Sequence, residues 1–164
     1  MKKLLALLLV AASPAAAHVV LDVAEAPAGS YSRIAFRVGH GCAGAATTAI
    51  EVTLPEGVTM ARPMPKTGWE IAIEMRAIAR PVPGAHGLVR EAAGSIAWRG
   101  GPLPDAQYDE FVMLIGTPDR AGETLVFPVM QRCEGGATAG WTEVADAAHP
   151  RPRNPAPTLR LGAR

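Results

Sequence analysis

His18 has the clearest chemical potential in the chain, because of what precedes it. Two lysines are followed by an apolar run at residues 4–12 and then by the small residues 15–17. A basic start, a short apolar run and an A-x-A ending are typical of a secretory signal peptide, and the run is too short to span a bilayer. We therefore expect residues 1–17 to be removed, so that His18 becomes the first residue of an exported protein.

An N-terminal histidine can chelate a metal ion without help from any other residue. Its α-amine nitrogen and its ring Nδ1 can both bind the same ion, and such nitrogen donors favour Cu(II) among the common divalent ions. Any residue can follow a cleavage site by chance, so the alternative is that His18 is incidental. The hypothesis that follows is a copper(II) site at the new terminus.

Other imidazole groups stand in weaker contexts. His40 lies in the glycine-rich turn 38–42, where it is either hydrogen-bonded to the backbone or a second metal ligand. His86 lies in a Pro/Gly-containing loop, and His149 precedes a tail rich in Pro and Arg.

Two carboxylates follow His18 closely enough to be considered as ligands. Asp22 shares a face with His18 in an extended strand, and Glu25 precedes Pro27, where the chain must turn. Strand geometry does not choose between them, and both can also be solvated surface groups.

The tryptophans divide into two groups. Trp69 and Trp98 lie in alternating apolar segments and are expected in the core. Trp141 follows the glycine-rich stretch 134–140, so it either packs in the core or shields a metal site.

Cys42 and Cys133 are the chain's 2 cysteines. In an exported protein they are expected to pair, and closing so long a loop contributes about 4–5 kcal/mol in the chain-entropy account. A copper-thiolate site is the alternative, but the chain has no Cys-x-x-Cys pair, and an oxidising compartment favours the disulfide.

Composition and motifs exclude several classes of protein. Lys and Arg number 16 against 15 Asp and Glu, so no basic excess favours binding to nucleic acid. There is no nucleophile elbow, no His-Glu-x-x-His motif and no phosphate-binding loop. We expect no enzymatic activity and no membrane span in the mature chain.

Short alternating segments separated by turns predict an all-β protein. The 17 Gly and 15 Pro of the chain favour many short strands over long helices. The expected strands are residues 18–23, 31–38, 47–54, 58–61, 69–75, 95–99, 108–115, 124–132 (with Pro128 at an edge or bulge), 140–144 and 158–161. Residues 76–93 read as a long loop or an irregular hairpin.

This spacing predicts an antiparallel β-sandwich, immunoglobulin-like, in a single domain. Composition places that domain at residues 18–146, after the signal peptide 1–17 and before a Pro/Arg-rich tail at 147–164.

A set of short segments, taken together and in order, resembles the YcnI-like family of exported copper-binding domains. They are HVVL (18–21), Glu25, AGSY (28–31), HGC (40–42) with Thr47-Thr48, VTLPEGV (52–58), KTGW (66–69), YDEF (108–111), FPV (127–129) with Cys133, WTEV (141–144) and NPAP (154–157). No single segment is specific, but the ensemble spans the mature chain.

The resemblance implies a β-sandwich that binds one copper(II) ion at its mature N-terminus through the amine and imidazole of the first histidine, a monohistidine brace. A glutamate and a tryptophan belong to that site. By position the histidine is His18, the tryptophan is Trp141 and the glutamate is Glu25, with Glu110 as the alternative. The implied function is to sequester copper or deliver it to another periplasmic or membrane copper protein.

Two further hypotheses stay open at this point. The first is a copper-dependent monooxygenase that uses a second histidine, His40 or His149. The second is a metal-free immunoglobulin-like interaction module, in which His18 has no special role.

The cleavage site can be tested by mass. We expect protein recovered from the periplasm or medium to begin at His18, as read by intact mass and N-terminal sequencing. A mature chain that begins at any other residue would contradict the chelate, because the α-amine would belong to another residue.

Overall fold

A computed structural model describes residues 18–84 and 87–164, so the expected signal peptide and His86 lie outside the described residues. The strands are β1 (Val20–Leu21), β2 (Glu25–Pro27), β3 (Tyr31–Val38), β4 (Thr47–Thr53), β5 (Met60–Pro63), β6 (Trp69–Gly84), β7 (Gly87–Leu103), β8 (Asp109–Gly116), β9 (Thr124–Val126), β10 (Val129–Cys133), β11 (Thr138–Trp141) and β12 (Thr158–Gly162). A short 3₁₀ helix, η1 (Glu134–Gly136), follows β10.

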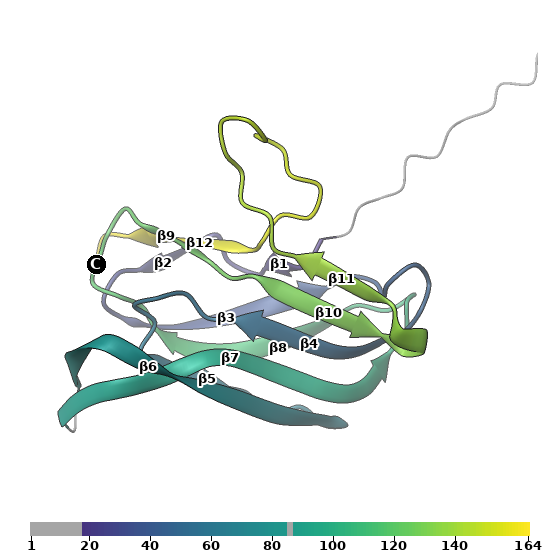
Figure 1. The fold of residues 1–164 in the computed structure, drawn as a ribbon, viewed down its shortest axis with the longest axis horizontal. Coiled ribbons are helices and arrows are strands. Elements are labelled where there is room, and N and C mark those ends of the chain that lie inside the picture. The colour runs from purple at the N-terminus through teal and green to yellow at the C-terminus, as the bar shows by residue number, and fades with distance from the viewer. Residues whose placement is uncertain (1–17, 85–86) are drawn as a thin grey trace, which may run out of the picture.

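Two antiparallel sheets form the sandwich. One has the strand order β1-β3-β8-β5 and the other β11-β10-β4-β7-β6, and they lie face to face (Figure 1). A third sheet, β2-β12-β9, lies along one side and contains the parallel pair β2–β12. The antiparallel β-sandwich predicted from the sequence is confirmed.

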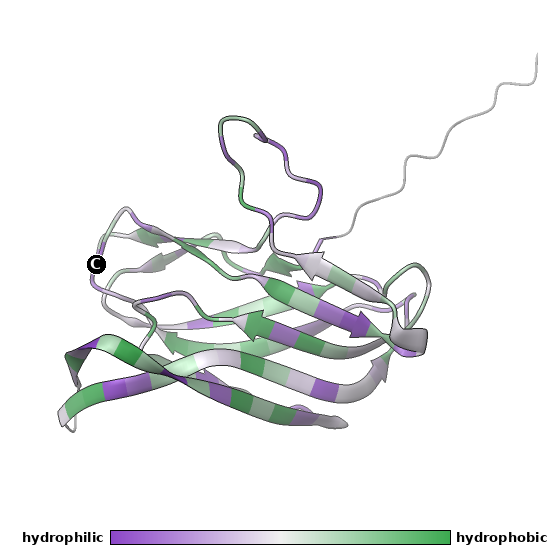
Figure 2. Ribbon diagram, in the orientation of Figure 1, coloured by the Kyte–Doolittle hydropathy of each residue, from purple (hydrophilic) through white to green (hydrophobic). Residues whose placement is uncertain are grey.

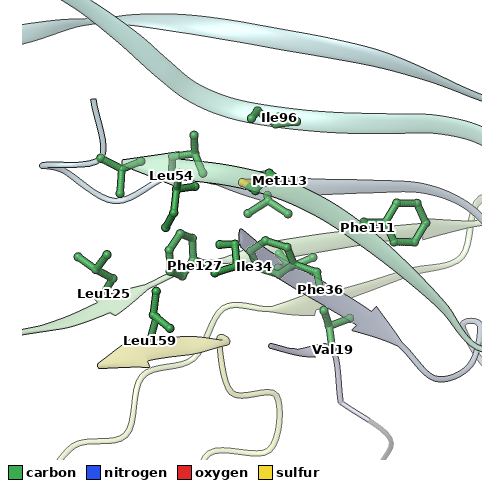
Figure 3. Packing of buried hydrophobic residues seen from close by; sticks show 14 of the residues in the cluster. Val19, Ile34, Phe36, Leu54, Ile96, Phe111, Met113, Leu125, Phe127 and Leu159 are labelled. Carbon is green, nitrogen blue, oxygen red and sulfur yellow. The ribbon is translucent and has the colours of Figure 1, made fainter. Parts of the chain in front are cut away.

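The core fills the space between the sheets. Green and purple residues alternate along the strands in Figure 2, as expected when one face of each strand is buried. Phe36 and Phe127 pack edge to face at 5.7 Å between ring centroids, and Trp98 packs on Phe111 at 5.6 Å. Figure 3 shows the aliphatic neighbours of these rings meeting in one cluster. The sandwich is therefore a rigid support for the loops at its ends.

Pro128 divides the segment predicted as one strand at residues 124–132. Proline has no N–H to donate to a ladder, so the chain leaves β9 there and enters β10 in a different sheet. The Pro128 carbonyl still accepts a hydrogen bond from Thr53 N.

The irregular segment 76–93 is a hairpin. β6 and β7 continue together to Gly84 and Gly87, and the pairing register shifts between Glu74 and Met75 and again between Ala77 and Val82. The outer part of this hairpin extends beyond the two sheets (Figure 1). Its side chains are mostly exposed, and this explains why no clear hydrophobic alternation marked it in the sequence.

β12 lies beyond the boundary that composition placed at residue 146. It pairs with β2 on one side and β9 on the other, and Leu159 and Leu161 are fully buried. The end of the chain is thus packed into the sandwich, although the segment between β11 and β12 is a projecting loop (Figure 1).

A tight turn positions the start of the disulfide. Cys42 and Ala45 exchange two backbone hydrogen bonds of 3.1 Å across Ala43 and Gly44, which both have positive φ. The disulfide joins Cys42 to Cys133 at the end of β10, with 5.9 Å between the Cα atoms. Both sulfurs are therefore used, and a copper-thiolate site is excluded while the bond is intact.

Within residues 18–84 and 87–164, no helix is long and apolar enough to cross a membrane.

The role of β12 can be tested by one substitution. Leu159→Ala removes a fully buried side chain and should lower the free energy of unfolding by about 2–5 kcal/mol, measured by urea denaturation. Arg160→Ala, on the exposed face of the same strand, is the control and should change it by no more than about 0.5 kcal/mol. Equal effects of the two variants would mean that β12 does not pack as described.

Candidate metal centre

Three aromatic side chains from distant parts of the chain meet near β1 and β11, the edge strands of the two sheets. His18 precedes β1, His40 follows β3, and Trp141 ends β11. The His18 ring lies 5.5 Å from the Trp141 ring between centroids, at 75°. The His40 ring lies 6.4 Å from the same indole, at 76°. Trp141 thus has an imidazole ring near it from each of two distant segments, in a T-shaped arrangement.

Pairing of β1 with β3 sets the position of His18. Val20 is in register with Arg37, and Leu21 is in register with Phe36. Val19 is buried in the core, so the chain is anchored immediately after His18. The ring is therefore close to the surface but attached to a rigid strand pair.

The His18 ring has a defined tautomer. Its Nε2 lies 3.1 Å from the carbonyl oxygen of Arg153. A carbonyl oxygen can only accept, so Nε2 must carry the proton and donate it. In the neutral ring this leaves Nδ1 deprotonated, with its lone pair free. Nδ1 is the ring nitrogen that can chelate a metal together with the α-amine of the same residue.

Trp141 is fixed by a buried hydrogen-bond network centred on Gln131. The indole Nε1–H donates to Gln131 Oε1 at 3.1 Å. Gln131 Nε2 donates to Thr47 Oγ1 at 2.7 Å and to the His40 carbonyl at 2.8 Å. Gln131 is 1% exposed and Thr47 is fully buried, so each of these groups depends on its protein partner. The network joins β4, β10, β11 and the His40 turn.

His40 joins the Gln131 network through its backbone carbonyl, and a separate hydrogen bond holds its ring. Its Nδ1 is hydrogen-bonded to the Gly41 carbonyl, which again requires the ring nitrogen to donate. The Gly41 N–H donates to Asp105 Oδ1 at 2.9 Å, so a second loop holds the turn. A Cβ at Gly41 would lie 1.8 Å from the Ala45 carbonyl oxygen, so this close turn requires glycine.

Asp22 and Glu110 are engaged with arginines. Asp22 accepts from Arg33 Nη1 at 2.7 Å and from Ala35 N at 2.7 Å, and so attaches the end of β1 to β3. Glu110 lies 3.5 Å from Arg37 Nε and 3.7 Å from Arg33 Nη2. Both carboxylates therefore pair with arginine side chains on the outer face of the β1-β3-β8-β5 sheet.

Glu25 lies in β2, in the third sheet. It is in register with Arg160, and a Cβ at Gly162 would lie 2.2 Å from its Oε1, so its carboxylate rests on β12. The structure thus brings His18 and Trp141 together, and neither residue forms a hydrogen bond or ion pair with Glu25 among the described residues. The role of Glu25 as a ligand stays a prediction.

Glu143 lies next to the peptide group whose carbonyl, that of Arg153, accepts the hydrogen bond from His18. Its Oε2 accepts from the Asn154 N–H at 2.9 Å, one peptide bond from the Arg153 carbonyl. His149 instead contacts Asp146 at 3.5 Å within the projecting loop. Among the described residues no group of three or more His, Cys, Asp or Glu side chains has the arrangement of a metal site.

Sequence reasoning missed Gln131 and Glu143. The signal for Gln131 was its place between Val129 and Cys133 on the inward face of an alternating strand, where a polar residue requires an explanation. Glu143 had no comparable signal, because its partner is a backbone N–H brought close only by the fold.

Comparison with known proteins identifies the family. A family model described as a domain of unknown function, DUF1775, matches residues 18–161. The chain belongs to the DUF1775 family. This is the domain of YcnI-like proteins, so the resemblance seen in the sequence is confirmed, and the match extends into β12 as far as Leu161.

Two relatives of this DUF1775 domain are informative. Copper-binding protein CutI of Bacillus subtilis (strain 168) is 24% identical over 140 residues, which are 84% of this chain and 61% of that protein. A crystal structure of an uncharacterized protein from Nocardia farcinica, described as having an immunoglobulin-like fold, has a TM-score of 0.69 and 33% identity. The aligned region covers 88% of this chain and 98% of the Nocardia farcinica chain. The immunoglobulin-like fold class is confirmed.

The Gln131 network can be tested through stability. Gln131→Leu leaves the Trp141 N–H and the His40 carbonyl without their partner, which should cost about 2–5 kcal/mol of unfolding free energy in urea. Gln107→Leu, at an exposed position, is the control and should cost less than about 0.5 kcal/mol. A stable Gln131→Leu protein would show that the network does not hold the indole.

Proposed function

We propose that this DUF1775 domain is an exported copper(II)-binding protein that sequesters copper or delivers it, with the metal held by a monohistidine brace at the mature N-terminus. The observation that carries the proposal is the donation of His18 Nε2–H to the Arg153 carbonyl. That bond leaves Nδ1 as the free ring nitrogen. Cleavage after residue 17 would supply the second nitrogen, the α-amine.

The surroundings of His18 fit a cupric ion. An amine and an imidazole nitrogen of one residue are donors that Cu(II) prefers in a tetragonal plane. The second ring nitrogen donates to a fixed carbonyl, a common arrangement for metal-binding histidines. Trp141, only 6% exposed, lies against the ring and limits access of water from that side.

The proposed function also includes a protein oxygen ligand for the copper ion and a second protein that gives or receives copper. The resemblance implies that Glu25 supplies a carboxylate, with Glu110 as the alternative, and Trp141 belongs to the same site. CutI is by its name a copper-binding protein, which supports copper as the metal here. The disulfide supports an oxidising location, the periplasm or the exterior, where another periplasmic or membrane copper protein would be donor or recipient.

A carrier role fits a site with one histidine. Copper monooxygenases use two-histidine braces, and the described contacts bring no second imidazole onto His18. The runner-up function is nevertheless a copper-dependent monooxygenase, because the His40 ring lies near the same indole. Copper-dependent oxidase or peroxidase activity that is lost in His40→Ala would favour the enzyme; its absence in the wild-type protein favours the carrier.

The proposal is tested by copper titration of the protein that begins at His18. Placing one alanine before His18, or making His18→Ala, should weaken Cu(II) binding by about 100-fold or more, because the first change converts the α-amine to an amide and the second removes the imidazole. Calorimetry with a competing chelator gives the affinity. His149→Ala is the control and should bind like the wild type.

Unchanged affinity in both altered proteins would contradict the brace. No Cu(II) binding by the wild-type protein would favour instead the metal-free immunoglobulin-like interaction module.

A further inference from the structure

The projecting loop between β11 and β12 (Figure 1) closes on a short stem next to His18. Thr142 N and Glu143 N both donate to the Asn154 carbonyl, at 3.1 and 3.0 Å. Ala156 N donates back to the Glu143 carbonyl at 2.8 Å, and Glu143 forms a parallel bridge with Pro155. We call residues 142–143 and 154–156 the loop stem. The stem therefore fixes the distance between Trp141, which precedes its first half, and Arg153, which precedes its second half.

The loop stem holds His18 at two points. Trp141, whose ring lies 5.5 Å from the imidazole, immediately precedes the stem. Arg153, whose carbonyl accepts the Nε2 proton, immediately precedes its second half. Because the stem residues are hydrogen-bonded to one another, the indole and the carbonyl are presented to His18 as one unit.

The peptide group between Arg153 and Asn154 is hydrogen-bonded at both ends. Its carbonyl accepts from His18 Nε2 at 3.1 Å, and its N–H donates to Glu143 Oε2 at 2.9 Å. In a trans peptide the C=O and the N–H point in opposite directions. The carboxylate and the imidazole therefore lie on opposite sides of this peptide, and Glu143 acts on the ring through it.

A carboxylate on the N–H changes the acceptor strength of the carbonyl. Hydrogen bonds to an ionised group are stronger than neutral ones, and hydrogen bonds in a chain polarise one another. The Arg153 oxygen thus becomes a better acceptor for the ring proton. A stronger bond at Nε2 holds the ring in one orientation and keeps the proton on Nε2, so that Nδ1 presents its lone pair to a metal, as carboxylates do for metal-binding histidines that they contact directly.

We propose that Glu143 is a positioning residue for His18, acting through the Arg153–Asn154 peptide to orient the ring and to strengthen Nδ1 as a metal ligand. The metal part of this proposal rests on the proposed copper function, whereas the hydrogen-bond relay exists in the metal-free protein. The two can therefore be tested separately.

The chain offers a matched control in the same loop. Asp146 is also an exposed loop carboxylate, and its Oδ1 accepts from Ala148 N at 2.8 Å and from His149 N at 2.6 Å. These bonds stay within the loop and do not reach the Arg153–Asn154 peptide. Asp146→Asn thus alters loop charge without altering the relay.

The relay is tested by NMR on metal-free protein that begins at His18. In the wild type the His18 Nε2 proton should give a downfield signal that exchanges slowly. In Glu143→Ala this signal should move upfield and exchange about 10-fold faster; Glu143→Gln, which keeps an acceptor without the charge, should lie between the two. Asp146→Asn should match the wild type. An unchanged signal in Glu143→Ala would overturn the relay.

Copper titration of the same proteins tests the link to the metal. Cu(II) affinity should fall about 10-fold in Glu143→Ala and less in Glu143→Gln, with Asp146→Asn unchanged. Thermal unfolding identifies any loss of folding, in which case Glu143→Gln, equal in size to the wild-type residue, is the deciding variant. If a Glu143 variant shows a moved Nε2 signal and still binds Cu(II) as tightly as the wild type, that result would overturn the proposed effect of Glu143 on Nδ1 as a metal ligand. Failure of the wild type to bind Cu(II) would instead count against the proposed function and leave the NMR result to decide the relay.

Discussion

The proposed copper site depends on one hydrogen bond, from His18 Nε2 to the carbonyl of Arg153. A carbonyl cannot donate, so the bond decides which ring nitrogen is protonated and leaves the nitrogen nearer the backbone free. Only that nitrogen lies close enough to the α-amine of the same residue to form a chelate. If the ring were turned over, the same histidine would be a single exposed imidazole with no special affinity for copper.

The sandwich makes this bond possible by bringing four distant segments together near the edge strands β1 and β11. The β1–β3 pair anchors the chain after His18, and β10 carries Gln131, which hydrogen-bonds the Trp141 indole and the His40 carbonyl. The disulfide attaches the His40 turn to the end of β10. The proposed site would draw its donors from a terminus and its supports from other segments, and it would need this rigid arrangement because no single element contains it.

The sequence predicted the regular parts of the fold well, for a physical reason. The strong alternation of residues 31–38 and 47–54 reflects strands with one buried face, and they appear as β3 and β4. The outer part of the β6–β7 hairpin has no buried face, so periodicity could not mark it. The burial of Leu159 depends on pairing with β2 and β9, far away in sequence, so composition alone assigned it to a tail. His18 could be identified from the cleavage pattern, but Trp141 entered through family resemblance, and the contacts of Gln131 and Glu143 exist only in the folded chain.

The central claim is that the amine and Nδ1 of His18 hold one copper(II) ion. It is tested most directly by a crystal structure of the protein beginning at His18, grown with Cu(II). We expect a single ion within bonding distance of the backbone nitrogen and Nδ1 of His18, with Nε2 still hydrogen-bonded to the Arg153 carbonyl. An ion bound through Nε2, or bound away from His18, would contradict it.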